Sequence, residues 1–200
     1  MKILQIISSP RGEASQTIQL SEAIIKKLTA KNNNASVTVR NLTVNPLPYI
    51  VDNHIQSFNT PPESRSAEHL EDIKLSDELL DELKTADTIV IGAPMYNFGI
   101  PAFLKSWIDH LARAGVAFTY TADGPVGLIL GKKVYLAIAT GGVYSEGDYK
   151  AVDFIEPYLR TSLGFFGLID ITAFSVEGVS VSALKDQAMQ VALDKLSVLD

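Results

Sequence analysis

Residues 88–93, TIVIGA, constrain the fold of this chain more than any other segment. The run is apolar on both faces of an extended chain, which is typical of a strand that is covered on two sides. Parallel sheets provide such cover through their crossover helices, whereas strands of antiparallel sheets commonly alternate apolar and polar positions. The segment therefore predicts a central strand of a parallel α/β sheet.

The same alternation of short apolar runs with stripes of helical spacing continues along the chain. We expect strands at residues 3–7, 37–42, 88–93, 134–139 and 169–176. We expect helices around residues 20–28, 70–83, 103–111, 153–163 and 183–196, the second of them broken near residues 76–77. Five strands that alternate with five helices predict an open, doubly wound, five-stranded parallel sheet with helices on both faces.

Two segments depart from this alternation. Residues 45–62 contain four prolines, and we expect them to form a long excursion without regular helix. Residues 116–120 and 124–127 have the pattern of a small hairpin before the fourth strand.

Composition disfavours several classes of partner and of chemistry. The 200 residues fit a single domain, 1–200, and 17 Lys and Arg against 23 Asp and Glu give a net charge of −6. This balance disfavours nucleic acids and anionic membranes as partners, because both require a basic surface. Without cysteine the chain has no disulfide, thiolate metal ligand or thiol redox couple, so any redox chemistry must come from a cofactor. Its apolar runs are too short for a signal peptide or a membrane span, and we expect a cytoplasmic protein.

The loops that follow the strands are where a sheet of this kind binds ligands. The first loop, residues 8–17, places Ser9, Ser15 and Thr17 just before a helix, where free backbone N–H groups favour an anion. The alternative is that Ser15 or Thr17 only caps the helix. The chain has neither a Gly-x-Gly-x-x-Gly nor a Gly-x-x-x-x-Gly-Lys-Ser/Thr motif, so a monophosphate group is favoured over a nucleoside triphosphate.

Two further loops have the composition of a ligand site. Residues 94–101 place a methionine, two aromatics and an amide between prolines, which suits a flat heteroaromatic ring; alternatively, the aromatics pack on the core. Residues 139–142 end in two glycines, which let the backbone approach a ligand closely but are also common in tight turns.

Other chemistries are disfavoured by the same sequence. We expect His54 in a loop and His69 and His110 in helices, without paired spacing, and therefore no metal site. A Gly-x-Ser-x-Gly nucleophile motif is absent, which argues against a hydrolase of the α/β type.

Together these segments resemble the FMN-dependent NADH-azoreductase family along essentially the whole chain. The most specific matches are residues 94–98 (PMYNF) and 112–116 (ARAGV), accompanied by Phe118, Tyr120 and the glycines at 141–142. The resemblance implies a flavodoxin-like fold and a homodimer with FMN near the subunit boundary. It also implies that NADH or NADPH drives the reduction of quinones and azo compounds.

Site residues follow from the resemblance position by position. It places the FMN phosphate at Ser9, Ser15, Gln16 and Thr17. It places the ring and ribityl chain beside Pro94, Met95, Tyr96, Asn97 and Phe98, with Ala139, Thr140, Gly141 and Gly142 at the other edge of the ring. The chain departs from the family at Ala139 and Thr140, where Ser-Arg is frequent, and at Ser162, where an aromatic residue is frequent.

The implied mechanism is ping-pong. The nicotinamide passes a hydride to the flavin and leaves, and a quinone or azo compound then takes two electrons, so that two rounds cleave an azo compound to two amines. We expect the N–H groups of Gly141 and Gly142 to stabilise negative charge at flavin N1, with no catalytic side chain, and hypothesise that Tyr120 and Phe98 flank the acceptor. The alternative is a flavodoxin-type electron carrier, although the acidic residues are spread and not concentrated on one docking face.

The homodimer also has candidate surfaces. Trp107, residues 45–62 and the pair Phe165–Phe166 are apolar segments that a second subunit could bury, although core packing explains Trp107 equally well.

Overall fold

The computed structural model describes residues 1–30, 32 and 34–199. Within these residues five strands form one parallel sheet in the order β2-β1-β3-β6-β7. The strands are β1 (Lys2–Ile7), β2 (Ser36–Asn41), β3 (Thr88–Pro94), β6 (Lys133–Ala139) and β7 (Asp170–Val176). The predicted five-stranded, doubly wound α/β fold is confirmed, and each strand lies within two residues of its expected bounds.

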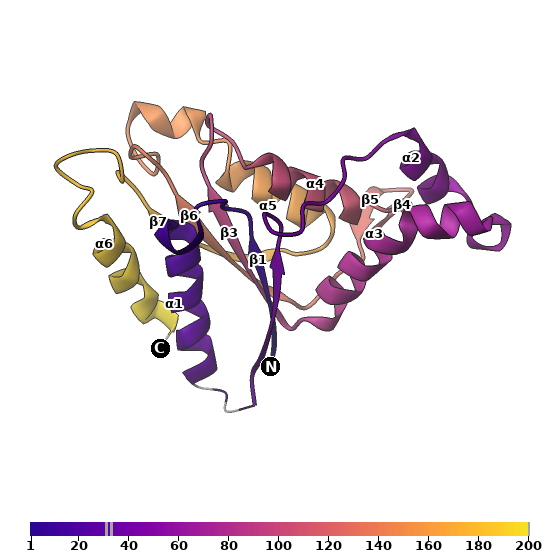
Figure 1. Cartoon of the computed structure of the whole chain (residues 1–200), viewed down its shortest axis with the longest axis horizontal. Helices are drawn as coiled ribbons and strands as arrows, with labels where there is room; N and C mark the ends of the chain where they lie inside the picture. Colours follow the sequence, from indigo (N-terminus) through magenta and orange to yellow (C-terminus); the bar gives the residue numbers. More distant parts are fainter. Residues whose placement is uncertain (31, 33, 200) are drawn as a thin grey trace.

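Helices cover both faces of this sheet (Figure 1). The helices are α1 (Gln16–Ala30), α2 (Asp52–Asn59), α3 (Ala67–Thr85), α4 (Ala102–Leu111), α5 (Glu156–Phe165) and α6 (Ala188–Asp194). Helices α1 and α6 lie on one face, and α3, α4 and α5 lie on the other. Short 3-10 turns are η1 (Gly12–Ala14), η2 (Pro62–Ser64), η3 (Asp148–Val152) and η4 (Lys195–Leu199).

The core lies in two layers on either side of the central strand β3, whose residues are all buried. On one face, Leu20 and Ile24 of α1 pack with Phe174 of β7. On the other, Trp107 and Phe166 are buried to 2% exposure or less. The expectation that these two aromatics offer a surface to a partner is therefore wrong, because the monomer already buries both; the neighbouring Phe165 is 36% exposed.

A small antiparallel hairpin, β4 (Phe118–Thr121) and β5 (Gly124–Gly127), lies beside the main sheet, as the sequence predicted. It packs so closely on the end of α5 that a Cβ atom at Gly127 would lie 2.1 Å from the backbone nitrogen of Gly167. The N–H of Ile129 then donates to the carbonyl of Phe166 at 2.9 Å, which ties the chain after the hairpin to the same turn.

The prediction that residues 45–62 contain no regular helix is wrong, because α2 occupies residues 52–59. The four prolines flank this helix and do not interrupt it, so they restrict only its approach and exit. His54 consequently lies in a helix and not in a loop. Helix α2 packs on α3, and the guanidinium of Arg113 lies 5.2 Å from the centre of the Phe58 ring.

The expected break at residues 76–77 is absent from α3, which the structure shows as continuous from Ala67 to Thr85. Both polar side chains find tertiary partners and do not compete for the backbone of the helix. The hydroxyl of Ser76 donates to the carbonyl of His110 at 2.6 Å, and Asp77 pairs with the buried Arg113.

The last two helices differ from their predicted bounds. Helix α5 begins at Glu156 and not at residue 153, because Pro157 fits the first turn of a helix and Asp153 accepts the N–H of Ile155 just before it. Helix α6 is limited to residues 188–194 and passes into η4. Across the described part of the chain, every helix is too short or too polar to cross a membrane.

Candidate functional site

A polar hollow of about 210 Å³ lies at the carboxyl edge of the sheet. It lies where the loops after β1, β3, β6 and β7 converge, which is the ligand-binding edge of an open α/β sheet. Its lining consists of Ser9, Arg11, Ser15, Gln16, Thr17, Pro94, Met95, Tyr96, Ala139, Thr140, Gly141, Val179 and Ser180. The structure therefore brings most of the sequence-predicted site residues together around one cavity.

Three buried hydroxyls lie at the α1 end of the hollow. Ser9, Ser15 and Thr17 are each 2% exposed or less. The oxygens of Ser15 and Thr17 are 3.0 Å apart, and Ser15 Oγ also accepts the N–H of Ile18 at 3.4 Å. Ser15 therefore caps α1 through a long hydrogen bond and lines the cavity at the same time. Hydroxyl donors at a helix start match the needs of a phosphate or another small anion.

The glycine loop after β6 has its carbonyls satisfied and its amides free. Gly141 O accepts from Ser180 N at 3.0 Å, and Gly142 O accepts from Gly178 N at 2.9 Å and from Thr140 Oγ1 at 2.8 Å. Among the hydrogen bonds of the described residues, none is donated by the N–H of Gly141 or Gly142. A tight turn accounts for the carbonyl bonds but leaves two donors for a ligand.

The loop after β3 presents its aromatic side chains to solvent. Tyr96 is 41% exposed and Phe98 48% exposed, so the alternative that both aromatics pack on the core is wrong. Tyr96 and Gly99 exchange two backbone hydrogen bonds, at 3.0 and 3.1 Å. Between them Asn97 and Phe98 have positive φ values of 49° and 69°, a conformation that costs roughly 1–2 kcal/mol for a residue with a side chain. Such strain is typical of functional loops.

Not every predicted residue lines this hollow. Asn97 and Phe98 lie in the strained turn beside it, and Gly142 follows its lining residue Gly141. Tyr120 lines a separate hollow of about 480 Å³, between α2, the end of α4 and the hairpin. The other lining residues of this second hollow are Ile50, Ile55, Phe58, Asn59, Asp109, Ala112, Ala114 and Phe118. Phe98 lines neither of these two hollows, and Tyr120 lies at a different hollow from the predicted cofactor residues.

Sequence reasoning missed three lining residues, Arg11, Val179 and Ser180. Arg11 lies in the first loop, where the sequence pattern alone assigns it no role. Val179 and Ser180 follow β7, and the rule that ligand loops follow parallel strands also applies to this fifth strand. Their apolar and hydroxyl side chains carried no signal of their own.

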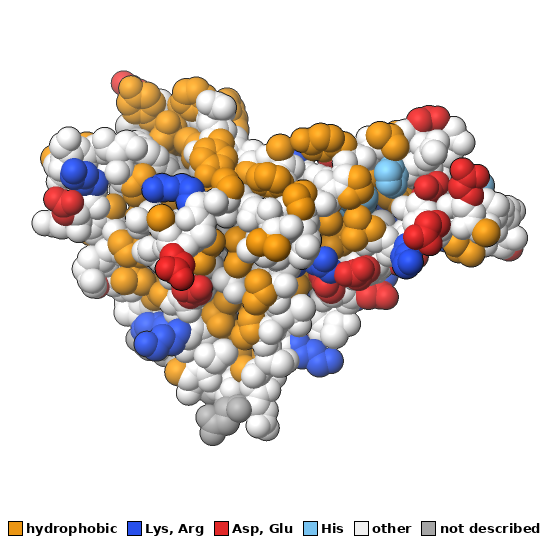
Figure 2. All heavy atoms as spheres, in the orientation of Figure 1, with side chains coloured by type: hydrophobic (Ala, Val, Ile, Leu, Met, Phe, Trp, Pro, Cys, Tyr) orange, Lys and Arg blue, Asp and Glu red, His pale blue; other side chains and the backbone are white. Residues whose placement is uncertain are grey.

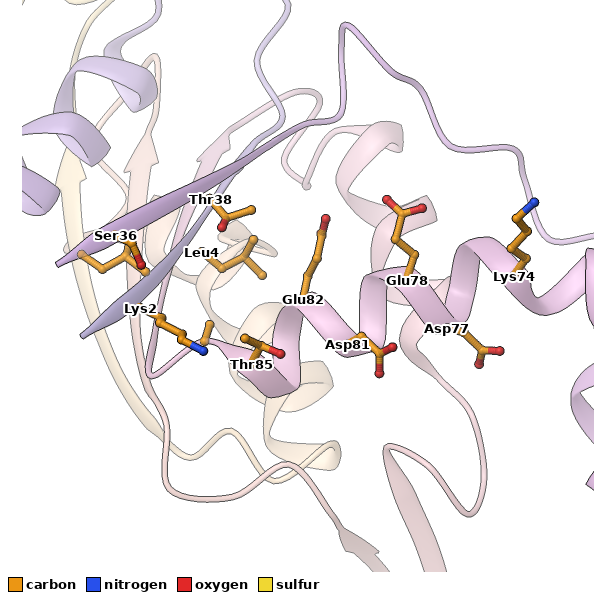
Figure 3. A pocket seen from close by; sticks show the side chains of 12 residues that line it. Lys2, Leu4, Ser36, Thr38, Lys74, Asp77, Glu78, Asp81, Glu82 and Thr85 are labelled. Carbon is orange, nitrogen blue, oxygen red and sulfur yellow. The ribbon is translucent and has the colours of Figure 1, made fainter. Parts of the chain in front are cut away.

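A larger hollow of about 700 Å³ lies at the opposite end of the sheet (Figure 3). It runs along α3 from Lys74 to Thr85 and meets the first residues of β1 and β2. Its carboxylates include Glu78 and Glu82, which pair with Arg40, and these hydrogen bonds raise the pKa of Arg40. The hollow lies at the amino ends of the strands, so it is not the ligand edge of the sheet.

The histidines are less scattered than expected. The rings of His54 and His110 lie 5.6 Å apart, edge to face. His110 is fully buried, its Nε2 lies 3.0 Å from the carbonyl oxygen of Pro48, and burial lowers its pKa. Among the described residues, no group of three or more His, Cys, Asp or Glu side chains is arranged to hold a metal ion.

The strand order β2-β1-β3-β6-β7 of the main sheet, with a polar hollow at its carboxyl edge, defines a flavodoxin-like α/β protein. Comparison with known proteins agrees, since the family model described as "Flavodoxin-like fold" matches residues 1–199.

Relatives define the group more narrowly. The FMN-dependent NADH:quinone oxidoreductase of Herminiimonas arsenicoxydans is 51% identical over 182 residues, which is 91% of this chain and 89% of that protein. An azoreductase structure from Bacillus anthracis superposes with a TM-score of 0.91 at 31% identity, covering 100% of this chain and 98% of that one. A B. anthracis FMN-dependent NADH-azoreductase in complex with FMN gives 0.86 at 26% identity, with 99% and 98% covered. The chain belongs to the flavodoxin-like family of these FMN-dependent oxidoreductases.

Proposed function

We propose that this chain is an FMN-dependent oxidoreductase that uses NADH, or NADPH, to reduce quinones and azo compounds. The observation that carries the proposal is a hollow with buried hydroxyls at a helix start on one side and, on the opposite loop, the unbonded N–H groups of its lining residue Gly141 and of the next residue, Gly142. A ligand with a phosphate at one end and a ring that carries hydrogen-bond acceptors at the other would pair with both sets of donors. The relatives named above are FMN-dependent enzymes that use NADH, which points to the same cofactor and donor.

The residues present fit FMN. Ser9, Ser15 and Thr17, with Gln16, provide donors for a phosphate without a lysine, and the start of α1 adds its positive dipole end. Arg11 lines the same hollow and adds a positive charge. FMN, when bound, supplies the hydride chemistry that no side chain of this cysteine-free sequence can supply.

At the other end of the hollow, the backbone provides the electrostatics of the reaction. With FMN bound, the unbonded N–H groups of Gly141 and Gly142 would stabilise negative charge at the edge of the ring. The carbonyls that share a peptide plane with these N–H groups, those of Thr140 and Gly141, already accept the N–H of Val179 at 3.2 Å and of Ser180 at 3.0 Å, so both planes are held before a ligand arrives. Such fixed dipoles stabilise charge without the cost of reorienting. The chemistry therefore requires no titrating side chain.

Substrate access favours ping-pong kinetics. Tyr96 and Phe98 offer exposed aromatic faces next to the hollow, which suit flat molecules such as a nicotinamide or a quinone. One open surface serves donor and acceptor, so the oxidised nicotinamide leaves before the acceptor binds. A quinone takes two electrons in one round, and an azo compound needs two rounds, four electrons and four protons to give two amines.

We also propose that the active form is a homodimer. A hollow of about 210 Å³ is smaller than the roughly 300–1,000 Å³ of typical ligand sites, so one chain covers only part of the cofactor. Figure 2 shows hydrophobic side chains gathered along the upper edge of the molecule as far as α2. Exposed aromatics include Phe98 and Tyr120, which is 71% exposed. In a homodimer the Tyr120 hollow of one protomer covers the cofactor hollow of the other.

Anaerobic stopped-flow spectroscopy tests the function. Protein reconstituted with FMN is mixed with NADH, and bleaching of the oxidised-flavin absorbance is followed before a quinone or an azo dye is added. We expect the oxidised-flavin absorbance to bleach with a rate constant of roughly tens per second or more, in the range of typical enzymes. The absorbance should recover fully when either acceptor is added. Bound flavin that NADH reduces only over minutes would contradict the proposal and identify an electron carrier that needs a separate reductase.

A further inference from the structure

The carboxylate of Glu177 holds the loop that follows the two glycines. Its Oε1 accepts the N–H of Tyr144 at 2.7 Å and the N–H of Ser145 at 2.8 Å. Its Oε2 accepts the hydroxyl of Ser145 at 2.6 Å. One side chain after β7 therefore fixes two consecutive peptide units of the loop after β6.

These bonds extend a ladder that joins the two loops. Three backbone bonds connect them, from Gly178 N to Gly142 O at 2.9 Å, from Val179 N to Thr140 O at 3.2 Å, and from Ser180 N to Gly141 O at 3.0 Å. The ladder holds residues 140–142 through their carbonyls. Without Glu177, the residues that follow Gly142, Tyr144 and Ser145, would lose the three hydrogen bonds that hold them to the loop after β7.

The two residues whose amides are free lie between these supports. Neither Gly141 nor Gly142 has a positive φ, so the direction of their unbonded amides depends on how the loop is held and not on a backbone conformation that only glycine adopts. The ring of Tyr144 lies over Gly142, where an added Cβ would be 3.4 Å from its Cε2. Fixing the backbone of Tyr144 thus also fixes what packs on Gly142.

We propose that Glu177 is a positioning residue that aims the Gly141 and Gly142 amides at the ring of the cofactor. The proposal rests on the proposed function, because it needs FMN in this hollow. Glu177 lines a different hollow from the cofactor residues and touches no group that we assign to the cofactor. It acts through the loop, by setting the direction of two dipoles.

Two substitutions of Glu177 distinguish the effect of its hydrogen bonds from the effect of its charge. In Glu177→Gln the amide oxygen can still accept both N–H groups, as Oε1 does now, and its NH2 can donate to the Ser145 hydroxyl. Glu177→Ala removes all three bonds. Glu146 offers a matched control, because it lines the same hollow as Glu177 and is exposed, and it makes no hydrogen bond or ion pair with the described residues.

The first test uses the apoprotein. Amide hydrogen exchange, followed residue by residue by NMR, should be at least about tenfold faster for Tyr144 and Ser145 in Glu177→Ala than in the unsubstituted chain. Glu177→Gln and Glu146→Ala should leave both rates within about twofold. Circular dichroism melts of each variant show whether the fold is intact.

The second test titrates FMN and riboflavin into each apoprotein by fluorescence quenching. For Glu177→Ala we expect both dissociation constants to rise about tenfold, the loss of roughly one directed hydrogen bond. The two flavins should weaken equally, because the amides face the ring and not the phosphate. Affinity for the reduced flavin should fall a further tenfold, which lowers the two-electron midpoint potential by about 30 mV. Glu177→Gln should restore affinity and potential.

The outcomes separate the two proposals. If the unsubstituted protein binds no FMN, the proposed function fails, whatever the amide exchange shows. If it binds FMN and Glu177→Ala matches it in affinity and potential, the positioning role is overturned. The role is equally overturned if Glu177→Gln loses as much as Glu177→Ala, or if Glu146→Ala loses as much, because hydrogen bonding at residue 177 is then not the cause. If Glu177→Ala fails to fold, Glu177→Gln and Ser145→Ala replace it, and Ser145→Ala removes one hydrogen bond only. Glu177→Gln must then bind both flavins as tightly as the unsubstituted chain. Ser145→Ala must raise the dissociation constants of both flavins.

Discussion

We expect the buried hydroxyls at the start of α1 to determine how strongly the site holds a phosphate. Ser9, Ser15 and Thr17 are removed from water, so a ligand that accepts their hydrogen bonds meets donors that are already desolvated. Hydrogen bonds to a charged group contribute about 1.5–3 kcal/mol, more than neutral pairs do. The phosphate should therefore account for much of the affinity for the cofactor.

Thr17→Val tests this contribution with almost no change of shape. We expect the dissociation constant for FMN to rise about 10- to 100-fold, because one donor to a doubly charged group is lost. The affinity for riboflavin, which lacks the phosphate, should stay within about threefold. Isothermal titration of both flavins measures this difference.

Thr29→Val is the matched control at the other end of the same helix, where the Thr29 hydroxyl donates to the carbonyl of Ile25 at 2.9 Å. It should leave both affinities unchanged. An equal loss of FMN and riboflavin affinity in Thr17→Val would show that Thr17 supports the fold of the loop and not the phosphate.

The buried ring of His110 makes stability depend on pH. Burial lowers its pKa from the ordinary value of 6.5, opposed by the carbonyl of Pro48 and by Asp109, while His54 acts in the same direction as burial. The unfolded chain takes up a proton near pH 6.5, and the folded chain does so only at lower pH. The contribution of His110 is therefore complete above pH 6.5 and is lost as the pH falls toward its folded pKa.

Urea unfolding at pH 7.5, 6.5 and 5.5 tests this linkage. The unsubstituted protein should lose up to about 1.4 kcal/mol of unfolding free energy per pH unit below pH 6.5 through this group. His110→Gln keeps a donor for the carbonyl of Pro48 and removes the titration, so its pH dependence over this range should be shallower. Equal slopes for the two proteins would exclude His110 as the source.

At the scale of elements, the hairpin is fitted to α5 by two glycines. A Cβ atom at Gly127 would lie 2.1 Å from Gly167 N and 2.3 Å from the carbonyl carbon of Phe166, both backbone atoms. Gly127→Ala should therefore force the hairpin away from the turn and lower the unfolding free energy by about 3 kcal/mol, or roughly 6–12 °C in Tm.

Gly164→Ala is the control for this substitution, because an added Cβ there has no atom within 4 Å and the residue lies inside α5. It should raise stability by about 0.5–1 kcal/mol through helix propensity. Calorimetric melts of the two variants compare the effects. A Gly127→Ala variant as stable as the unsubstituted protein would mean that the hairpin does not pack on α5 in solution.

The elements differ in how far the sequence could predict them. Strand β3 was predictable because burial on both faces leaves a continuous apolar run, and the same holds for β6. Helix α2 was not, since prolines around it conceal a proline-free window that packs on α3. The supposed break in α3 depended on partners of Ser76 and Asp77 that are distant in sequence.

In the candidate site, too, the features set by local sequence were predictable and those set by contacts between distant segments were not. Its hydroxyl and aromatic loops were predictable, because they directly follow strands. The part played by residues 177–180 was not, because it depends on hydrogen bonds between two loops that only the sheet brings together.

The whole molecule is expected to work as a pair of chains. Sedimentation equilibrium at micromolar concentration should give twice the chain mass of 21.7 kDa, because the exposed apolar residues beside the hollow need cover. Tyr120→Asp, in a position 71% exposed in one chain, should shift the protein toward monomer and weaken FMN binding together. A single-chain mass for the unsubstituted protein that still binds FMN would exclude a shared site.

A crystal structure of the FMN complex tests the central claim most directly. We predict the phosphate at Ser9, Ser15 and Thr17, and an edge of the ring within about 3 Å of the N–H groups of Gly141 and Gly142, a hydrogen-bond distance. FMN bound elsewhere, such as the acidic hollow along α3, or bound with those two amides unpaired, would contradict the account.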